Sequence, residues 1–468
     1  MKNTFGINDI NLVAATDSYK ITHWRQYPAW TKTIFSFFES RGGEFPEVTF
    51  FGLQYILKRY FEGIVITQED VNEMAEDCAL HFGDPSLFNM KGWKRILEVH
   101  GGRLPILIRA IPEGTSIPNG NVLMTIENTD PELPWLTNYV ETLLSQVWYP
   151  CTVATQSRQM KKLIIRYLEE TGDPGLIDFK LHDFGFRGST SVESAGIGGA
   201  AHLVNFKGSD TIQALRVARK YYKERMAGFS IPAAEHSTVT SWGRENEVEA
   251  YRNMLIAFPQ GMVAVVSDSY DVFTACEELW GKKLRDMVED RDGVLVVRPD
   301  SGEPAEVVLK VLEALGRSFG YTINDKGYRV LNPKVRVIQG DGIDYPTIGK
   351  ILETMKQAGW SADNTAFGSG GALLQKVNRD TLKFAFKCCA ALVGNTWRDV
   401  MKNPVTDPGK KSKAGRLVLV KVDGQFKTLR EEEAQSQGLE NLLVPVFKDG
   451  KLLFDQTFDE IRTRALVD

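Results

Sequence analysis

Polar segments that follow short apolar runs carry the residues of this 468-residue chain best suited to chemistry. In RPDSG, the guanidinium of Arg298 can pair bidentately with a phosphate, and Asp300 can accept ribose hydroxyls or help to hold Mg²⁺. In QGDG, Gly340 and the glycine that follows Asp341 leave room for a ligand. A surface salt bridge and a plain turn are the alternatives, but the combination favours a site for a phosphorylated sugar.

The motif GSGG, which ends in Gly370 and Gly371, follows another apolar run and precedes LLQK. Glycines allow backbone N–H groups to approach phosphate oxygens, and a helix beginning there would add a favourable dipole. A tight turn without function is the alternative. The late position of the motif in the chain favours a phosphate site, because late loops bind phosphate in many β/α barrels.

Two further segments supply an aromatic ring and a histidine. In HDFGFRGS, Phe184 could stack on a flat heterocycle and Arg187 could bind neighbouring phosphates, whereas Phe186 is expected in the core. In PAAEHST, His236 follows Glu235 and could be a base, a ligand or a phosphate acceptor. A lone histidine usually has none of these roles, so this segment alone does not establish a role for His236.

Basic residues gather late in the chain. Such a run is usually a solvated surface, but beside phosphate chemistry it is consistent with an entrance for polyphosphate. The residues concerned are Arg379, Lys387, Lys402, Lys410, Lys411, Lys413 and Arg416.

The elements that must position these residues alternate between strands and helices from about residue 176 to 376. VAVVS, VLVV and VRVI are almost continuously apolar and rich in β-branched residues, which is typical of parallel strands covered on both faces. Between them, apolar residues recur at helical spacing over 272–279, 308–315 and 348–355. The pattern predicts an α/β domain. A barrel is favoured over an open sheet because the chemically interesting residues all follow strands, whose carboxyl ends form one face of a barrel.

The two ends of the chain have a different pattern. Asp-Gly turns between apolar runs predict hairpins at 420–429 and 446–454, and the N-terminal third mixes a helix at 137–150 with strands over 104–118. We therefore predict a barrel domain at 151–376 and a second α+β domain built from 1–150 and 377–468.

Composition sets the remaining limits. A net charge of −4 gives no general attraction to nucleic acid or anionic membranes, so neither is an expected partner. The N-terminus lacks the apolar core of a signal peptide, and no stretch approaches the roughly 20 apolar residues of a membrane span. The five cysteines include no CxxC pair, which favours reduced thiols over disulfides or a zinc site. A cytoplasmic protein is expected.

The chain resembles the nicotinamide phosphoribosyltransferase family over nearly its full length. The resemblance is carried by many motifs in order: ATDSYK (15–20), FFGLQYIL (50–57), IPEG (111–114), ENTDPE (127–132), KLHDFGFRG (180–188), AHLVNFKGSD (201–210), PAAEHST (232–238), SDSYD (267–271), RPDSG, IQGDG, AFGSGG and LLQK. It implies a type II phosphoribosyltransferase fold, an irregular β/α barrel beside an α+β domain built from both chain ends. It also implies a homodimer with shared active sites.

The resemblance implies roles for individual residues. Phe184 and the partner subunit's Tyr19 would hold the nicotinamide ring, with Asp210 accepting the carboxamide NH₂ and Arg298 nearby. His236, Asp268 and Asp300 would be catalytic. Phosphoribosyl and pyrophosphate groups would be bound by Arg187, His236, Arg298, Asp300, Gly340, Asp341, Gly370, Gly371 and Arg379. Phosphate contacts across the dimer would come from Arg41, Lys387, Lys402 and Lys410.

The implied reaction joins nicotinamide to 5-phosphoribosyl 1-pyrophosphate in NAD salvage. Mg²⁺ would be held through the substrate's pyrophosphate, with help from Asp268 rather than from a dedicated protein site. ATP would phosphorylate His236 and so couple its hydrolysis to the transfer. Because a pyridine nitrogen attacks without losing a proton, no general base is needed.

Three other interpretations remain open. A nicotinate phosphoribosyltransferase would share the fold, but a carboxylate at Asp210 would repel nicotinate. An aldolase or isomerase acting on a sugar phosphate would favour a Schiff-base lysine at a strand end, and the strand-end motifs offer none. A binding protein without catalysis would have little reason to keep every site motif.

Overall fold

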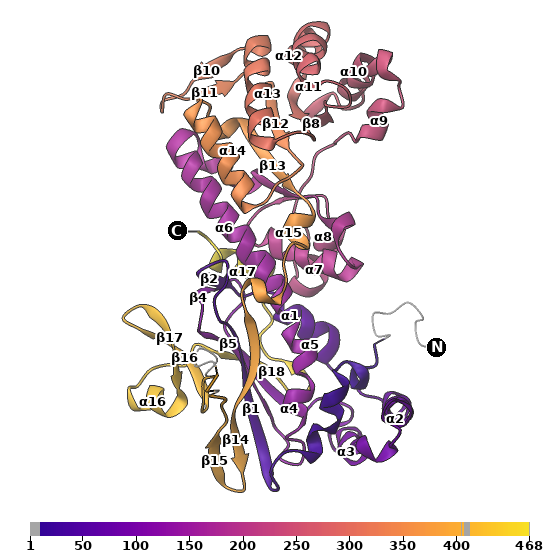
Figure 1. Cartoon of the computed structure of the whole chain (residues 1–468), viewed down its shortest axis with the longest axis vertical. Helices are drawn as coiled ribbons and strands as arrows, with labels where there is room; N and C mark the ends of the chain where they lie inside the picture. The colour runs from indigo at the N-terminus through magenta and orange to yellow at the C-terminus, as the bar shows by residue number, and fades with distance from the viewer. Residues whose placement is uncertain (1–9, 404, 407–411, 468) are drawn as a thin grey trace. The chain divides into compact units, whose positions relative to one another are not determined.

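The computed structural model describes residues 10–403, 405–406 and 412–467, and the chain forms two compact units. The first unit comprises Met1–Thr155, Lys220–Lys223 and Asn378–Ala465. The second comprises Gln156–Arg219, Glu224–Val377 and Leu466–Asp468. Each unit has its own central sheet (Figure 1).

The second unit is built on six parallel strands, as the continuous apolar runs predict. Their order in the sheet is β7 (Gly208–Ser209), β6 (Leu181–Asp183), β13 (Thr365–Ser369), β12 (Val335–Gln339), β9 (Asp292–Arg298) and β8 (Gln260–Val266). Ala264, Val296 and Ile338 from three of these strands pack into one cluster, against which Phe184 lies.

An irregular segment joins the two edges of this sheet. Phe229 forms a parallel bridge with Gly208 of β7, and Ala233 forms one with Ala264 of β8. The Phe229 N–H donates to the Lys207 carbonyl at 2.7 Å. The segment therefore closes the sheet into an irregular barrel, and the predicted fold class is confirmed.

Helices connect the strands, and α13 and α14 pack side by side (Figure 1). The helices of the second unit are α7 (Val192–Leu203), α8 (Ile212–Tyr222, which ends in the first unit), α9 (His236–Thr240), α10 (Glu247–Ala257), α11 (Val272–Thr274), α12 (Arg285–Asp290), α13 (Pro304–Phe319), α14 (Tyr345–Gln357) and α15 (Gly371–Leu374). A small hairpin joins β10 (Tyr321–Ile323) to β11 (Arg329–Leu331). The stripes at 308–315 and 348–355 lie on α13 and α14 as predicted. After α11, however, the chain continues as a π-helix over Ala275–Lys283 rather than as an α-helix.

The first unit contains a seven-stranded antiparallel sheet, with long strands β1, β5 and β14 visible in Figure 1. Its order is β15 (Thr396–Asp399), β14 (Phe384–Val393), β1 (Thr31–Ser40), β5 (Val122–Asn128), β3 (Ile106–Ala110), β18 (Val444–Lys448) and β19 (Lys451–Leu452). Two further pairs join β2 (Glu47–Thr49) to β4 (Ser116–Pro118) and β16 (Leu417–Val422) to β17 (Gln425–Arg430). The helices are α1 (Leu53–Ile56), α2 (Gln68–Phe82), α3 (Met90–His100), α4 (Leu136–Tyr139), α5 (Glu141–Ser145), α16 (Glu431–Ser436) and α17 (Phe458–Arg464).

Both hairpins predicted from Asp-Gly turns are present. Asp423 and Gly424 have φ values of 51° and 77°, and Asp449 and Gly450 have values of 49° and 79°. Two successive positive φ angles are the mark of the type I′ turn, which explains the Asp-Gly pairs.

The single helix expected over 137–150 is wrong. The structure has α4 and α5 there, followed by α6 (Trp148–Thr171), which runs from the first unit into the second. Pro150 lies in the first turn of α6, and its ring would clash with the carbonyl of Gln146 in a continuous helix. The helical pattern is therefore interrupted just before α6.

Candidate active site

Three of the predicted site residues meet around a fourth, Gly340, which directly follows β12. A Cβ added to Gly340 would lie 3.2 Å from Asp300 Oδ1, 3.5 Å from Arg298 Cδ and 3.5 Å from Phe184 Cε2. The Phe184 ring also lies on Gly368 of β13, where a Cβ would come within 1.9 Å of ring atom Cε2. The absence of a side chain at Gly340 and Gly368 therefore leaves room for the Phe184 ring and for the loop that carries Arg298 and Asp300.

Arg298 has a buried Nε without a hydrogen-bond partner in the described part of the chain. Its Nη2 atom lies 3.7 Å from Asp300 Oδ2, which is a loose ion pair. A buried guanidinium N–H without an acceptor is costly, so this group is well suited to bind an anionic or carbonyl ligand.

Asp210 follows β7 directly and joins the same cluster. Its Oδ1 atom accepts hydrogen bonds from His182 Nε2 at 2.9 Å and from Ser230 Oγ. Burial opposes its ionisation, but these hydrogen bonds, helped by the positive charge of Arg298, bring the pKa of Asp210 below its ordinary value. At neutral pH Asp210 is therefore an anion that can only accept hydrogen bonds.

His236 begins α9 and is hydrogen-bonded to Asp268, which follows β8. His236 Nε2 and Asp268 Oδ1 are 3.0 Å apart, and His236 Nδ1 is 4.0 Å from Asp300 Oδ2. The other oxygen of Asp268 accepts from the Asp300 N–H at 3.0 Å and from the Ser301 hydroxyl at 2.5 Å. A nearly buried carboxylate thus orients a half-exposed imidazole beside the Arg298 loop.

The two glycine-containing loops at this end of the barrel lie against each other. A Cβ at Gly188 would lie 3.3 Å from the Gly371 Cα, and one at Gly185 would lie 2.9 Å from the Gly370 carbonyl. The short 3-10 helix Phe186–Gly188, which carries the exposed Arg187, therefore lies beside the GSGG loop. A Cβ at Gly371 would meet nothing within 4 Å, so the space in front of this loop is open.

Two expectations need correction here. Phe186 is 36% exposed rather than part of the core, because it lies in a short 3-10 helix none of whose residues is buried. The helix after GSGG, α15, has only four residues, so its dipole is far weaker than expected.

Asp341 is exposed, and its neighbour Gly340 has the contacts given above.

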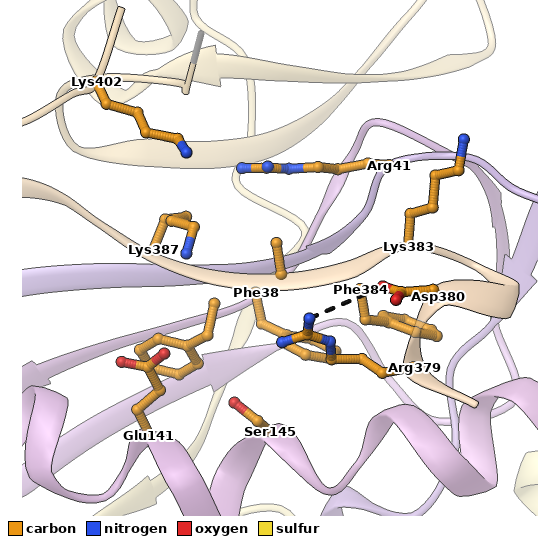
Figure 2. Close-up of a pocket in the computed structure, with 12 residues that line it drawn as sticks. Phe38, Arg41, Glu141, Ser145, Arg379, Asp380, Lys383, Phe384, Lys387 and Lys402 are labelled. Carbon is orange, nitrogen blue, oxygen red and sulfur yellow. Dashed lines mark ion pairs between the residues drawn. The ribbon is translucent and has the colours of Figure 1, made fainter. Parts of the chain in front are cut away.

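Four of the predicted basic residues line a pocket of about 590 Å³ in the first unit (Figure 2). Two others do not line it: Lys413 pairs with Glu39, and Arg416 pairs with Glu127 and Glu431. Its cationic residues are Arg41, Arg379, Lys383, Lys387 and Lys402. The charged ends of Arg41 and Lys402 point toward each other. Burial lowers the pKa of the Lys387 ammonium, and the neighbouring positive charges lower it further, although Glu141 acts in the opposite direction.

The two carboxylates of this pocket already have partners. Glu141 pairs with the buried Lys20 at 2.7 Å, and Asp380 with Arg379 at 3.8 Å. The pocket therefore keeps an excess of positive charge that suits phosphate groups.

Tyr19 belongs to the same unit and is 58% exposed, with its ring 5.0 Å from that of His23. Lys410 lies outside the described residues, as does Lys411.

Two residues of these clusters, Lys383 and Ser230, escaped the sequence analysis, as did the contact of His182 with Asp210. Lys383 lines the cationic pocket and lies between Arg379 and Lys387 in the sequence, so its spacing from these predicted residues was the available signal. Ser230 follows no motif, and its contact with Asp210 spans 20 residues. His182 lies in the quoted KLHDFGFRG motif, but nothing in the motif indicates its bond to Asp210.

Among the described residues, no group of three or more His, Cys, Asp or Glu side chains could hold a metal ion. Both oxygens of Asp268 are used in hydrogen bonds, so Asp300 is the better placed carboxylate for Mg²⁺. Such a sparse donor set fits an ion that takes most of its ligands from substrate phosphates.

None of the helices that the structure describes has the length and apolar character needed to span a membrane.

Comparison with known proteins identifies the family. Residues 179–451 match the nicotinate phosphoribosyltransferase family model, and residues 11–108 match the N-terminal domain model of nicotinamide phosphoribosyltransferase. A nicotinamide phosphoribosyltransferase of Xanthomonas campestris pv. campestris (strain 8004) is 52% identical over 463 residues, which are 97% of this chain and 98% of that protein.

Two solved structures share the fold at low sequence identity. A nicotinate-nucleotide pyrophosphorylase from Pyrococcus furiosus has a TM-score of 0.60 at 15% identity, covering 99% of this chain and 97% of its own. Human nicotinic acid phosphoribosyltransferase has a TM-score of 0.57 at 17% identity, covering 96% of this chain and 92% of its own. The full-length relative and the two family models confirm the resemblance seen in the motifs: the chain belongs to the nicotinamide phosphoribosyltransferase family.

Proposed function

We propose that this protein condenses nicotinamide with 5-phosphoribosyl 1-pyrophosphate, giving nicotinamide mononucleotide and pyrophosphate. The observation that carries the proposal is the ionised Asp210 in one cluster with Phe184 and Arg298. A carboxylate accepts an N–H from an amide but repels the carboxylate of nicotinate. The 52% identical relative bears the name of this activity.

The residues around Gly340 suit the chemistry of this transfer. Departure of pyrophosphate leaves positive character on the ribose, which the carboxylate of Asp300 can stabilise, while Arg298 offers an unpaired N–H to the substrate. Mg²⁺, when bound with the substrate, would neutralise the leaving group. Phe184 would hold the nicotinamide ring flat, so that its nitrogen attacks the sugar from a fixed position.

The same proposal includes coupling to ATP through His236. Asp268 is bonded to Nε2, so a proton held there leaves the lone pair on Nδ1 free to attack the γ-phosphorus of ATP. The P–N bond forms as the bond to ADP breaks, and water later hydrolyses the phosphohistidine. We expect radiolabelled ATP to mark the wild type in an acid-labile form and not to mark His236→Ala. Equal labelling of His236→Ala would refute this part.

We also propose a homodimer with shared sites. Its support is that the proposed substrate-binding residues are divided between the two compact units. Tyr19 and the cationic pocket belong to the first unit. Mixing inactive Tyr19→Ala with inactive Phe184→Ala should restore activity after subunit exchange, because one site of each heterodimer carries neither change. Full activity of a particle that light scattering shows to be monomeric would refute the shared site.

One experiment tests the central proposal. The protein is incubated with Mg²⁺, 5-phosphoribosyl 1-pyrophosphate and either nicotinamide or nicotinate, and the mononucleotide is identified by mass spectrometry. We expect nicotinamide mononucleotide as the preferred product, and Asp210→Asn should narrow the preference by roughly 10-fold or more, since a charged hydrogen bond and a repulsion are both lost. Preferred formation of the nicotinate product would identify a nicotinate phosphoribosyltransferase instead.

A further inference from the structure

The hydrogen bonds to Asp210 are distributed unequally between its two oxygens. Oδ1 accepts from both His182 Nε2, at 2.9 Å, and Ser230 Oγ. In the residues that the structure describes, Oδ2 accepts no hydrogen bond from the protein. One oxygen is therefore fixed by the protein, and the other is free to meet a substrate.

Each donor lies on or beside a segment that is paired with the sheet. His182 lies on β6 opposite Gly208, and a Cβ at Gly208 would lie 2.6 Å from His182 Nδ1, so the imidazole lies close to this backbone. The same imidazole is 5.0 Å from the Phe184 ring. Ser230 lies on the segment that closes the barrel, next to the bridge formed by Phe229.

The backbone of Asp210 is fixed as well. Its N–H donates to the Asp183 carbonyl at 3.0 Å, at the end of β6. These bonds to the backbone and to Oδ1 restrict rotation of the carboxylate. It is nevertheless 45% exposed, so water and ligands can reach it.

We propose that His182 and Ser230 are positioning residues for substrate selection: by binding Oδ1 together, they hold Asp210 as an anion with Oδ2 directed to the carboxamide of nicotinamide. This inference rests on the proposed function. Removing either donor should let the carboxylate rotate and accept a proton more easily. Discrimination against nicotinate should then fall, while the sites for ribose and phosphate remain.

The test compares variants that lose a donor with variants that keep one. Ser230→Ala and His182→Phe remove the donor with little change of shape, whereas Ser230→Thr and His182→Gln retain an O–H or N–H. The matched control is Ser436→Ala, which removes an exposed hydroxyl bonded only to the Glu433 carbonyl. The kcat and KM of each variant are measured for nicotinamide and nicotinate. Where nicotinate turnover is too slow, its inhibition constant is used.

We expect the nicotinamide-to-nicotinate ratio of kcat/KM to fall about 10-fold in each donor-less variant, and to recover largely in Ser230→Thr and His182→Gln. Because both substrates are measured on one preparation, partial unfolding cancels from the ratio. An unchanged ratio in Ser230→Ala and His182→Phe overturns the inference. A wild-type protein that makes no mononucleotide from nicotinamide overturns the proposed function itself.

The pH dependence supplies a second measurement, which a purely structural role would not change. The groups that face Asp210 are His182 on β6, Ser230 on the closing segment and the charge of Arg298 on β9. The charge of Asp210 is present at neutral pH and is lost as the pH falls through its lowered pKa. In Ser230→Ala the pKa should rise, so the preference for nicotinamide should disappear at a higher pH than in the wild type. Coincident pH profiles would contradict the role of Ser230.

Discussion

Gly368 offers the sharpest test of where the nicotinamide ring binds. A Cβ at this position would lie 1.9 Å from Phe184 Cε2, 2.3 Å from Cδ2 and 2.9 Å from Cζ. Carbon atoms in contact are about 3.5–4.0 Å apart, so Gly368→Ala must displace the ring by at least about 1.5 Å. The backbone of β13 cannot easily yield, because this strand pairs with both β6 and β12.

A displacement of this size should be costly for catalysis. A misplacement of about 1 Å can lower a rate by about 100-fold, and we expect a fall of this order in kcat/KM for nicotinamide. The KM for 5-phosphoribosyl 1-pyrophosphate should change much less, because Arg298 and Asp300 lie beside Gly340, whereas the atoms nearest to a Cβ at Gly368 all belong to Phe184.

The assay is steady-state kinetics with each substrate varied in turn. The control is Gly349→Ala on α14, where an added Cβ would meet Leu163 at an ordinary 3.6 Å. Phe184→Ala removes the ring without a clash and should lose nicotinamide activity to a similar extent, which separates ring position from folding. If Gly368→Ala keeps wild-type kinetics for nicotinamide while its melting temperature matches that of the control, Phe184 is not the stacking surface.

Three further predictions concern other residues. Asp268→Asn should reduce stimulation by ATP at least about 10-fold more than ATP-independent transfer, because the orienting bond to His236 is weakened; equal losses in a coupled assay would contradict this. Lys387→Met should raise the KM for 5-phosphoribosyl 1-pyrophosphate about 10-fold and weaken its dependence on salt, and an unchanged KM at low ionic strength would exclude a phosphate contact. Asp130 is bound by Arg95 at 2.7 Å and by His100 at 2.7 Å, and although burial opposes it, these bonds lower its pKa. Its stabilisation is therefore present at neutral pH and lost as the pH falls through the lowered pKa, so Asp130→Asn should cost about 1.5–3 kcal/mol in urea unfolding near neutral pH and progressively less in acid.

The strands and the residues at their ends could be predicted because the signal is local. A buried parallel strand must be apolar on both faces, and the polar residue that ends it is adjacent in the sequence, as with Arg298 at the end of β9. The Asp-Gly hairpins are equally local, since two adjacent residues determine the turn.

The features that could not be predicted from the sequence depend on contacts between distant segments. The closing segment, with Phe229 and Ala233, is short and contains Pro232, and isolated bridges rather than a regular strand join it to the sheet. The bond from Ser230 to Asp210 arises from this closure, so no motif could indicate it. The open carboxylate oxygen of Asp210 is likewise visible only once both donors are placed.

The order of strands in the first unit has a consequence for synthesis on the ribosome. Ser40 of β1 pairs with Phe384 of β14, so one edge of β1 waits for about 340 further residues before its partner exists. At roughly 5–20 residues per second, this delay lasts about 20–70 s. The chain made meanwhile includes the entire β/α barrel, which can fold before the unit that starts the chain is complete. Until then the edge of β1, with the sequence TIFSFF, is an unpaired apolar strand, and the nascent protein should depend on chaperones most during this interval.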